Sequence, residues 1–333
     1  ADIYIICVPT PFYSDKEIPS PNIEFIVNAT NSIAPLIKSG DIVILESTSP
    51  VGTTDKIAKI LSESGIDTQT IAIAYCPERV LPGKIMMELI SNDRIVGGLN
   101  KLSTQKVADF YKTFVKGKIY ETNSETAEMC KLTENSFRDV NIALANELSI
   151  ICKENNIDVW ELIHIANKHP RVNILQPGAG VGGHCIAVDP WFIVSKNPNS
   201  SKLIKTAREV NNQKPKWIEE IILKEKDRLY SLLNKEIKIG FLGLSFKPDI
   251  DDLRESPALE IVESIYKNYQ NIMIAEPNIS DYPGINISNF NEVIEDCDLI
   301  VILQKHSIFV QNKELLNKRN DIYILDFCGL LAN

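Results

Sequence analysis

The alternation of short apolar segments with amphipathic ones constrains this chain more than any other feature. Three apolar runs near the start have the length of strands and end at turns rich in proline or glycine: 3–8, 42–45 and 71–75. Helical periodicity fills the intervals, and such alternation predicts a parallel sheet with helices on its faces. We expect the first helix to take Ser20 as its N-cap and Pro21 as its first residue, and to end before Gly40.

A second pattern of the same kind begins after residue 235. Four apolar runs have the length of strands: 237–242, 272–275, 299–303 and 322–325. Ser256 followed by Pro257 has the form of a helix start. This part of the chain therefore predicts a second sheet of the same architecture.

The region between the two patterns is predicted to be helical. One periodic stretch covers 124–156, Asp158 has capping-box spacing for the next helix, and another helical stretch covers 201–233, where Pro215 would kink or break it. A loop rich in glycine and proline, too long for a simple connector, covers 169–190. The predicted fold class is α/β, with two Rossmann-like parallel-sheet domains, the first truncated, joined by a central helical domain. The expected domain boundaries are 1–120, 121–234 and 235–333.

Charge and composition exclude several classes of partner. The formal net charge of -9 argues against nucleic acid as the main partner. No apolar run approaches the roughly 20 residues of a membrane-spanning helix, so we expect no membrane partner. The seven cysteines lack metal-ligand spacing, so we expect no metal, and their odd number favours free thiols in the reducing cytoplasm. Five cysteines lie in apolar stretches and are expected to be buried: Cys7, Cys76, Cys130, Cys152 and Cys297.

Cys185 differs from these because glycines precede it. A cysteine beside consecutive glycines is open to a substrate, and free backbone N–H groups nearby can stabilise a thiolate or an oxyanion. Asp189, four residues further on, would orient a water or a lysine. The structural alternative is a glycine turn around a buried cysteine. A hydrolase pairing Cys185 with His184 is disfavoured, because adjacent residues rarely face each other.

The glycines at 178, 180 and 183 match the dinucleotide-binding pattern in form only. That pattern must follow a strand and open a helix, whereas these glycines follow Leu175-Gln-Pro177 and lead into the cysteine loop. We therefore expect no nucleotide site there.

Lys131, Asn135 and Arg138 have spacings that place them on one face of the long helix. Lysine and asparagine there would hold or protonate an oxygen, and arginine would reach a phosphate. The alternative is a solvated polar face with a local ion pair between Lys131 and Glu134.

Three further segments carry charged groups at positions typical of ligand sites. Glu78 and Arg79 come just after a strand, where they would serve as a base and a phosphate clamp, or as a simple surface pair. Lys247 and Arg254 lie in a loop after another strand, and the ends of parallel strands are where such sheets bind ligands. His169 and Arg171 precede the cysteine loop and would add cationic groups or cap a helix.

Taken in order, these segments resemble the UDP-glucose/GDP-mannose dehydrogenase family over essentially the whole chain. The matching segments are Val8–Pro11, Glu46–Thr53, Pro77–Glu78, Lys131 with Asn135, the cysteine loop, Phe246–Pro248 and Asp252–Pro257. The segments around Cys185 and from His169 to Leu175 resemble the branch that acts on UDP-N-acetyl-D-mannosamine. Val188 stands where the UDP-glucose branch usually has a lysine.

The resemblance implies an NAD-dependent, two-step oxidation of the sugar's primary alcohol to a carboxylate, through a thiohemiacetal and a thioester on Cys185. The catalytic residues it implies are Cys185, Lys131, Asn135, Asp189 and Glu78. The contacts with the UDP-sugar that it implies, some of them across a homodimer or higher homo-oligomer, are Arg79, Val80, Arg138, His169, Arg171, Gly182, Phe246 and Lys247. The contacts with NAD that it implies are Thr10, Thr48 and Arg254.

The family's first strand, glycine-rich loop and helix have no counterpart before Ala1. We therefore expect a truncated NAD-binding domain, and a rival reading is a fragment that binds a UDP-sugar without NAD. Within the same family, UDP-N-acetylglucosamine, UDP-glucose and GDP-mannose are rival substrates.

Overall fold

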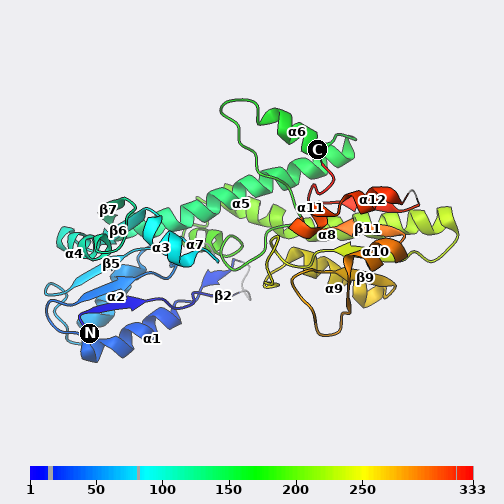
Figure 1. Ribbon diagram of the computed structural model, residues 1–333. Coiled ribbons are helices and arrows are strands. Elements are labelled where there is room, and N and C mark those ends of the chain that lie inside the picture. The colour runs from blue at the N-terminus through cyan, green and yellow to red at the C-terminus, as the bar shows by residue number, and fades with distance from the viewer. Residues whose placement is uncertain (14–17, 81–82, 320, 333) are drawn as a thin grey trace. The chain divides into compact units, whose positions relative to one another are not determined.

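The computed structural model describes residues 1–13, 18–80, 83–319 and 321–332, which form two compact units (Figure 1). The first unit consists of Ala1–Ser136 and Val188–Lys202, and the second of Phe137–Ala187 and Leu203–Asn333. Each unit contains a five-stranded sheet with helices packed against it, which confirms the predicted α/β class. The three-domain division stays a prediction.

The sheet of the first unit has the strand order β1-β4-β5-β6-β7. Its strands are β1 (Ile3–Ile6), β4 (Ile42–Leu45), β5 (Ala72–Tyr75), β6 (Arg94–Gly98) and β7 (Ile119–Asn123). The first three coincide with the predicted apolar runs and are parallel, with Ile3 opposite Ile42 and Ile42 opposite Ala72. β5 is buried along its whole length, as expected for a strand covered on both faces.

β6 runs antiparallel to β5, which departs from the parallel sheet predicted from the sequence. The intervening helix α3 (Ile85–Ser91) has no buried residue, so it does not cover the sheet as the crossover helix of a parallel pair would. Helix α4 (Lys101–Lys112) does pack on the sheet, and it joins β6 to β7, which are parallel.

The first helix begins later than predicted. Ser20 and Pro21 form strand β3, which pairs antiparallel with β2 (Phe12–Tyr13), and α1 covers Glu24–Ile33. The prediction of the N-cap was wrong: Ile23 is the N-cap residue of α1, without a capping side chain. Just before it, Asn22 Oδ1 accepts a 2.8 Å hydrogen bond from the backbone N–H of Glu24, which satisfies one of the first N–H groups of the helix.

The remaining helices connect the strands or cover the sheets. Their bounds are η1 (Ala34–Leu36), α2 (Thr53–Glu63), α5 (Ser124–Glu154), α6 (Val159–Ala166), α7 (Asp189–Lys196), α8 (Lys202–Leu233), α9 (Pro257–Asn268), α10 (Phe290–Asp296), α11 (Ser307–Gln311) and α12 (Glu314–Lys318). In the first unit, Val43 of β4 faces a core built with α1 and α2, and its neighbour Ile44 faces the opposite core built with α4.

The long helices agree with the sequence prediction. α5 is continuous over the predicted stretch, and Asp158 caps α6 by accepting the backbone N–H groups of Trp160 and Glu161 at 2.8 and 3.2 Å. Pro215 lies buried inside α8 and does not break it.

The sheet of the second unit is parallel throughout, in the order β10-β9-β8-β11-β12. Its strands are β8 (Ile239–Leu242), β9 (Ile272–Ala275), β10 (Ile287–Ser288), β11 (Leu299–Ile302) and β12 (Tyr323–Asp326). The chain winds outward in both directions from the central β8, so the strand order reverses between β8 and β11. Ligands of such sheets bind at the carboxyl ends of the strands beside that reversal. Ser256 caps α9 as predicted.

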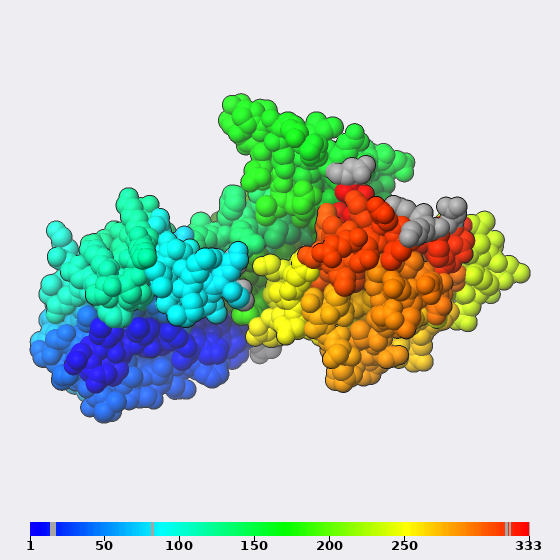
Figure 2. Space-filling model, viewed as in Figure 1, coloured from blue at the N-terminus to red at the C-terminus, as the bar shows by residue number. Residues whose placement is uncertain are grey.

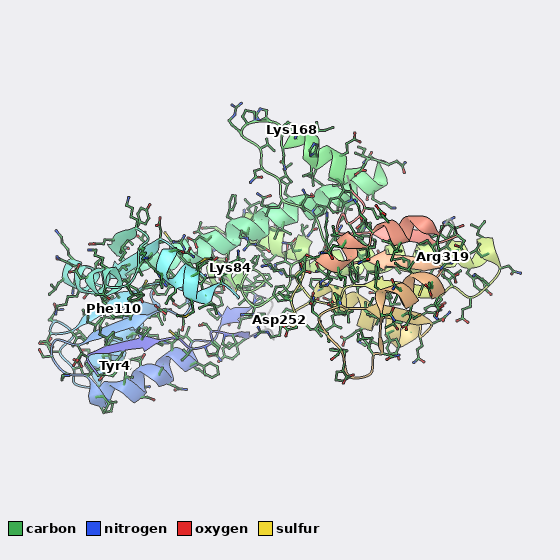
Figure 3. All side chains as sticks on the ribbon, in the orientation of Figure 1. Tyr4, Lys84, Phe110, Lys168, Asp252 and Arg319 are labelled. Atoms are coloured by element: carbon green, nitrogen blue, oxygen red, sulfur yellow. The ribbon has the colours of Figure 1, made fainter. Side chains whose placement is uncertain are left out.

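The segment that carries α6 and the following loop projects from the second unit and is coloured green in Figure 2. Lys168, which follows α6 by two residues, lies at its outer end (Figure 3). Within the described residues, the helices are all too short or too polar to span a bilayer.

Three of the five cysteines expected to be buried are buried: Cys76, Cys152 and Cys297. Cys130 is half-buried. The prediction was wrong for Cys7, which is exposed just after β1, where its thiol donates a 3.3 Å hydrogen bond to Glu46.

Candidate active site

The first unit brings together Lys131, Asn135, Asp189 and the loop after β5. Lys131 donates a 2.8 Å hydrogen bond to the backbone oxygen of Glu78, and the Asn135 amide donates to Asp189 Oδ2. Lys131 and Asn135 belong to α5, and Asp189 is the first residue of α7. The sequence therefore identified groups that lie on different elements and contact one another.

Asp189 has an unusual environment for a carboxylate. Only 3% of the residue is exposed. Burial raises its pKa to about 6, although the Asn135 hydrogen bond and the charge of Lys131 both oppose this shift. A carboxyl group with this pKa changes charge near neutral pH, which suits a group that handles protons or orients a water.

Neither of the two local ion pairs considered in the sequence analysis, Glu78 with Arg79 and Lys131 with Glu134, forms in the structure. Arg79 pairs with Glu134 at 2.8 Å and donates to the backbone oxygen of Asp93 at 3.2 Å. Glu78 accepts the backbone N–H of Val80. Because Glu134 is taken by Arg79, Lys131 stays directed toward the loop.

Thr10 and Thr48 follow β1 and β4, two adjacent parallel strands, so both lie at the edge where such sheets bind nucleotides. The Thr10 hydroxyl oxygen is buried and has no hydrogen-bond partner among the described residues. Buried hydroxyl groups are normally paired, so this orphan group fits a site completed by a bound cofactor. NAD is therefore compatible with the residues present at this edge.

Glu128 is a functional candidate that the sequence analysis missed. It lies on α5, fully buried, and its carboxylate accepts the backbone N–H groups of Gly52 and Thr54 at 2.6 and 2.8 Å. It thereby caps the N-terminus of α2 from another helix. Burial raises the pKa of Glu128, while these hydrogen bonds oppose the shift. Its partners lie more than seventy positions away in the sequence, so no local pattern could have revealed it.

The second unit carries Cys185, which is exposed and forms no disulfide. The alternative in which the glycine turn surrounds a buried cysteine is therefore wrong. Arg254 lies nearby: its pKa is raised mainly by Asp252, with a smaller contribution from Cys185. Arg254 was expected at NAD, and its side chain makes a two-pronged ion pair with Asp252 at 2.9 and 2.7 Å.

The glycines before Cys185 are needed for packing. A Cβ atom on Gly182 would lie 2.4 Å from the backbone oxygen of Glu255 and 2.6 Å from Phe246, and one on Gly183 would lie 2.8 Å from the Phe246 ring. Gly183 also has a φ of +78°, which residues with side chains rarely adopt. The Phe246 side chain therefore supports the turn, and substrate contact at Gly182 and Phe246 stays a prediction.

Three asparagine side chains hold the first half of the cysteine loop. Asn146 accepts the N–H of Gly178 at 2.9 Å, Asn141 accepts that of Leu175 at 3.0 Å, and Asn167 accepts that of Ile174 at 2.8 Å. The sequence analysis did not single out these residues, because an asparagine on a helix, such as Asn141 or Asn146, or at its end, such as Asn167, does not indicate which loop it binds.

A buried polar chain extends behind Asn146. Its amide donates to Asn211 Oδ1 at 2.9 Å, and Asn211 donates to Asp139 Oδ1 at 2.8 Å. The Asp139 carboxylate also pairs with Arg208 at 2.6 Å, and both side chains are nearly or fully buried. This chain joins α5 to α8 beneath the loop.

The loop that carries Phe246 and Lys247 is fixed at the carboxyl end of β8. Glu276 accepts the N–H groups of Leu244 and Ser245 at 2.7 and 3.1 Å, and His306 Nε2 lies 3.2 Å from the same carboxylate. Burial raises the pKa of Glu276, but the hydrogen bonds from His306 and the backbone outweigh it, so the pKa is lowered.

Four of the five cationic groups expected at the UDP-sugar are exposed, namely Arg138, His169, Arg171 and Lys247, and the fifth, Arg79, is half-buried. The candidate residues thus fall into two sets, one in each unit, and the role of each residue stays a prediction. The described residues contain no cluster of three or more histidine, cysteine or acidic side chains that could hold a metal ion.

Comparison with known proteins identifies the family. Residues 1–115 match the NAD binding domain of the UDP-glucose/GDP-mannose dehydrogenase family, 125–213 its central domain and 240–333 its UDP binding domain. Similar proteins include UDP-N-acetyl-D-mannosamine dehydrogenase from Escherichia coli K12, which is 50% identical over 99% of this chain and 82% of its own length. NDP-N-acetyl-D-galactosaminuronic acid dehydrogenase from Ralstonia solanacearum is 49% identical over 93% of this chain and 74% of its own length.

A solved structure agrees with these matches. UDP-D-ManNAc dehydrogenase from Pyrococcus horikoshii superposes with a TM-score of 0.87 at 37% identity, covering 99% of this chain and 78% of that one. The predictions of NAD as cofactor and of an NAD-dependent UDP-sugar dehydrogenase are confirmed. The chain therefore belongs to the UDP-glucose/GDP-mannose dehydrogenase family.

Proposed function

We propose that the protein oxidises C6 of UDP-N-acetyl-D-mannosamine twice, giving UDP-N-acetyl-D-mannosaminuronate. The observation that carries this proposal is the exposed Cys185 on a glycine turn, in a chain half identical to UDP-N-acetyl-D-mannosamine dehydrogenase over nearly its whole length. An exposed thiol in a reducing compartment, which we take to be the cytoplasm, remains available as a nucleophile.

NAD, when bound, accepts a hydride in each oxidation. The neutral amine of Lys131 takes the proton of the C6 hydroxyl as the alcohol becomes an aldehyde. The Cys185 thiolate then adds to the aldehyde carbon, and the new oxygen takes that proton back from Lys131 to give a thiohemiacetal. Loss of a second hydride from carbon and of the hydroxyl proton to Lys131 leaves a thioester. Water then cleaves the C–S bond, releasing the carboxylate and the thiol.

The first unit supplies the groups that handle protons. The Lys131 Nζ atom donates to a carbonyl oxygen, so a substrate oxygen beside it would be held in the same way. Asn135 and Asp189 form a buried pair suited to orienting the reacting oxygen or the attacking water. The Glu78 carboxylate assists hydrolysis as a base. Thr10, Thr48 and Arg254 hold the cofactor.

The remaining predicted residues bind the UDP-sugar. Cations suit its diphosphate, because arginine and lysine form strong charge-assisted hydrogen bonds with phosphate oxygens. The cations assigned to it are Arg79, Arg138, His169, Arg171 and Lys247. Val80, Gly182 and Phe246 complete the contact surface.

Oligomer formation is part of the proposal. Phe137, Leu144 and Ile151 are all exposed on α5 at intervals of seven residues, which aligns them on one face of the helix. We expect a second copy to cover this stripe, because an aligned row of exposed large apolar side chains is typical of an interface. Sedimentation of the Leu144→Glu variant tests this. A wild-type protein that sediments as a monomer would contradict the proposal.

Substrate identity is the step that needs an experiment. NADH formation by the full-length protein should be compared for UDP-N-acetyl-D-mannosamine, UDP-N-acetylglucosamine, UDP-glucose, GDP-mannose and UDP-N-acetylgalactosamine. We expect two NADH per molecule of the mannosamine substrate and little from the others. The similarity to the Ralstonia enzyme makes the galactosamine sugar the second candidate, and preference for any other sugar would overturn the assignment.

The role of the cysteine is tested separately. Cys185→Ser should perform the first oxidation and stall, whereas Cys328→Ser, a control in the same unit, should form both NADH molecules. Titration of the present chain with UDP and with NAD examines the alternative of a fragment. Binding of UDP without NAD would favour that alternative for the isolated chain.

A further inference from the structure

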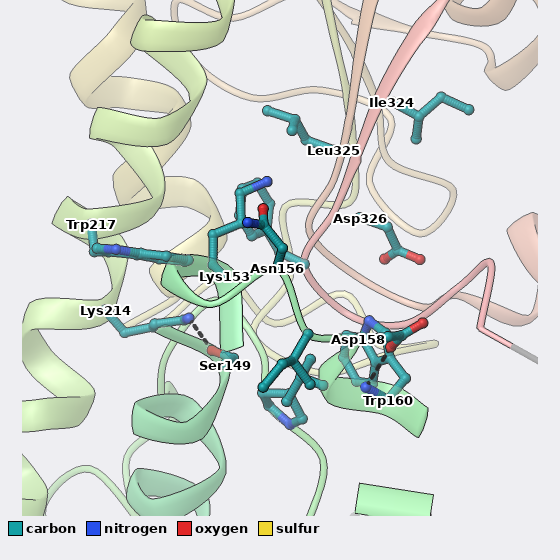
Figure 4. Close-up of a pocket in the computed structure, with 14 residues that line it drawn as sticks. Ser149, Lys153, Asn156, Asp158, Trp160, Lys214, Trp217, Ile324, Leu325 and Asp326 are labelled. Carbon is teal, nitrogen blue, oxygen red and sulfur yellow. Dashed lines mark hydrogen bonds between the residues drawn. The ribbon is translucent and has the colours of Figure 1, made fainter. Parts of the chain in front are cut away.

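The second unit contains a cavity of about 500 Å³ bounded by α5, α6, α8 and β12 (Figure 4). Its wall includes Lys214 and Trp217 from α8, Ser149 from α5, and Pro177 from the loop that leads to Cys185. None of the residues assigned to the sugar, to NAD or to the chemistry lines it. The cavity therefore calls for a separate explanation.

Lys214 is the unusual member of this wall. Only 2% of the residue is exposed, and its ammonium nitrogen donates to Ser149 Oγ and lies 3.9 Å from the centroid of the Trp217 ring. An ammonium group has three N–H donors. Among the described residues, Ser149 is its one hydrogen-bond acceptor, and no carboxylate lies within ion-pair distance.

A buried cation without a counter-ion is unfavourable, because it has lost its hydration and gained no opposite charge. Burial accordingly lowers the pKa of Lys214 to about 7. An anionic group placed in the cavity would supply the missing acceptors and favour the charged form. The lysine thus faces an open volume in which a bound anion would supply the negative charge that the chain does not.

The rest of the wall is suited to a flat apolar body. Trp217 and Phe327 lie edge to face with ring centroids 6.2 Å apart, and the indole of Trp160 lies over Gly329. Lys153 adds a second cation. Aromatic walls with few convergent polar groups are typical of small-molecule sites.

Two carboxylates also line the cavity, apart from Lys214 (Figure 4). Asp158 accepts the backbone N–H groups that begin α6, and Asp326 accepts those of Cys328, Gly329 and Leu331 at 2.8 to 3.0 Å. Both oxygens of Asp326 and the Oδ1 atom of Asp158 therefore hold the local backbone, and neither carboxylate lies within ion-pair distance of Lys214.

We propose that this cavity binds a small organic anion with a flat apolar body, whose charged group lies against Lys214 and Ser149 and whose body lies along Trp217 and Phe327. The proposal concerns a second ligand site and does not depend on which sugar the enzyme oxidises.

The test uses 8-anilinonaphthalene-1-sulfonate as the anionic probe and N-phenyl-1-naphthylamine as its uncharged analogue. Two of the three tryptophans line the cavity, so energy transfer from tryptophan to the probe reports binding there. Lys214→Met keeps an unbranched side chain but removes the charge. Lys216→Met, which changes an exposed lysine on the same helix, is the matched control.

We expect Lys214→Met to weaken the anionic probe about tenfold, as loss of one charged hydrogen bond does, and to leave the neutral probe within about twofold. Lys216→Met should change neither. Equal binding of the sulfonate by wild type and Lys214→Met would overturn the proposal. So would an equal loss of both probes, which would point to packing rather than charge, or the absence of any saturable binding.

Discussion

Asn146 accepts the backbone N–H of Gly178 at 2.9 Å, and so ties the C-terminal third of α5 to the loop that carries Cys185. Both polar atoms of this buried amide are used, since its nitrogen donates to Asn211. The loop has little regular structure of its own. Its shape therefore depends on hydrogen bonds supplied by the helices beneath it.

We expect Asn146→Ala to lower kcat by about 100-fold, because a displacement of about 1 Å at a reacting group has that effect. The substitution should also change the rate at which Cys185 is alkylated relative to wild type, while KM for the sugar changes less. Asn155→Ala, on an exposed residue just after the same helix, is the control. Unchanged kcat and unchanged thiol reactivity in Asn146→Ala would show that the loop holds its shape without this contact.

The two glycines Gly182 and Gly178 offer a matched pair in the same loop. A Cβ on Gly182 would meet the Glu255 carbonyl at 2.4 Å, whereas one on Gly178 would have nothing within 4 Å. Gly182→Ala should therefore displace the loop or lower the free energy of unfolding by about 1–3 kcal/mol. Gly178→Ala should be neutral. Activity and thermal unfolding of both variants check this, and equal behaviour of the two would contradict the steric argument.

The sequence predicted the elements better than their partners. Apolar runs such as 42–45 identify a strand, because a buried strand needs apolar side chains on both faces. The 3.6-residue period likewise placed Lys131 and Asn135 on one face of α5. Ser20 was misread because Ser-Pro suits both a helix start and a short paired strand, and the choice depends on the residues around Phe12 that it pairs with.

Contacts between distant residues escaped prediction for a related reason. Glu128 reaches Gly52 across 76 positions, and Asn146 reaches Gly178 across 32. A buried carboxylate and an amide on a helix give no local signal of such partners. The close approach of Phe246 to the glycine turn was equally invisible, because a glycine pair is compatible with an open substrate path or with tight packing.

The buried carboxyl group of Asp189 predicts a specific dependence of stability on pH. Its pKa is raised from 3.8 to about 6 in the folded protein, so the folded state binds more protons than the unfolded state between these values. Its contribution to the free energy of unfolding is therefore present below pH 3.8 and is lost as the pH rises through 6. Asp189→Asn removes this dependence on pH. As the pH rises from 4 to 7, the free energy of unfolding of the variant should therefore increase by about 2–3 kcal/mol relative to that of wild type.

Chemical denaturation of wild type and Asp189→Asn over this pH range measures the difference directly. Asp227→Asn, on an exposed residue of α8, is the control and should give a difference that stays nearly flat. The Asp189 variant should also lose activity at every pH, because an amide cannot replace a carboxylate in proton handling. A flat stability difference would mean that Asp189 titrates at its ordinary pKa.

Lys214 predicts a pH dependence in a higher window. Its pKa falls from 10.5 to about 7 on folding, so the unfolded state binds more protons than the folded state between these values, and stability rises with pH across this window. Replacing the buried lysine by Met removes that cost. Lys214→Met should therefore be more stable than wild type at pH 7, and the gain should shrink by roughly 1 kcal/mol for each pH unit above 7. The exposed-lysine variant Lys216→Met should track wild type at every pH. The other charged residues that line the cavity are Lys153, Asp158 and Asp326. A gain for Lys214→Met that did not change between pH 7 and pH 9 would contradict the lowered pKa of Lys214.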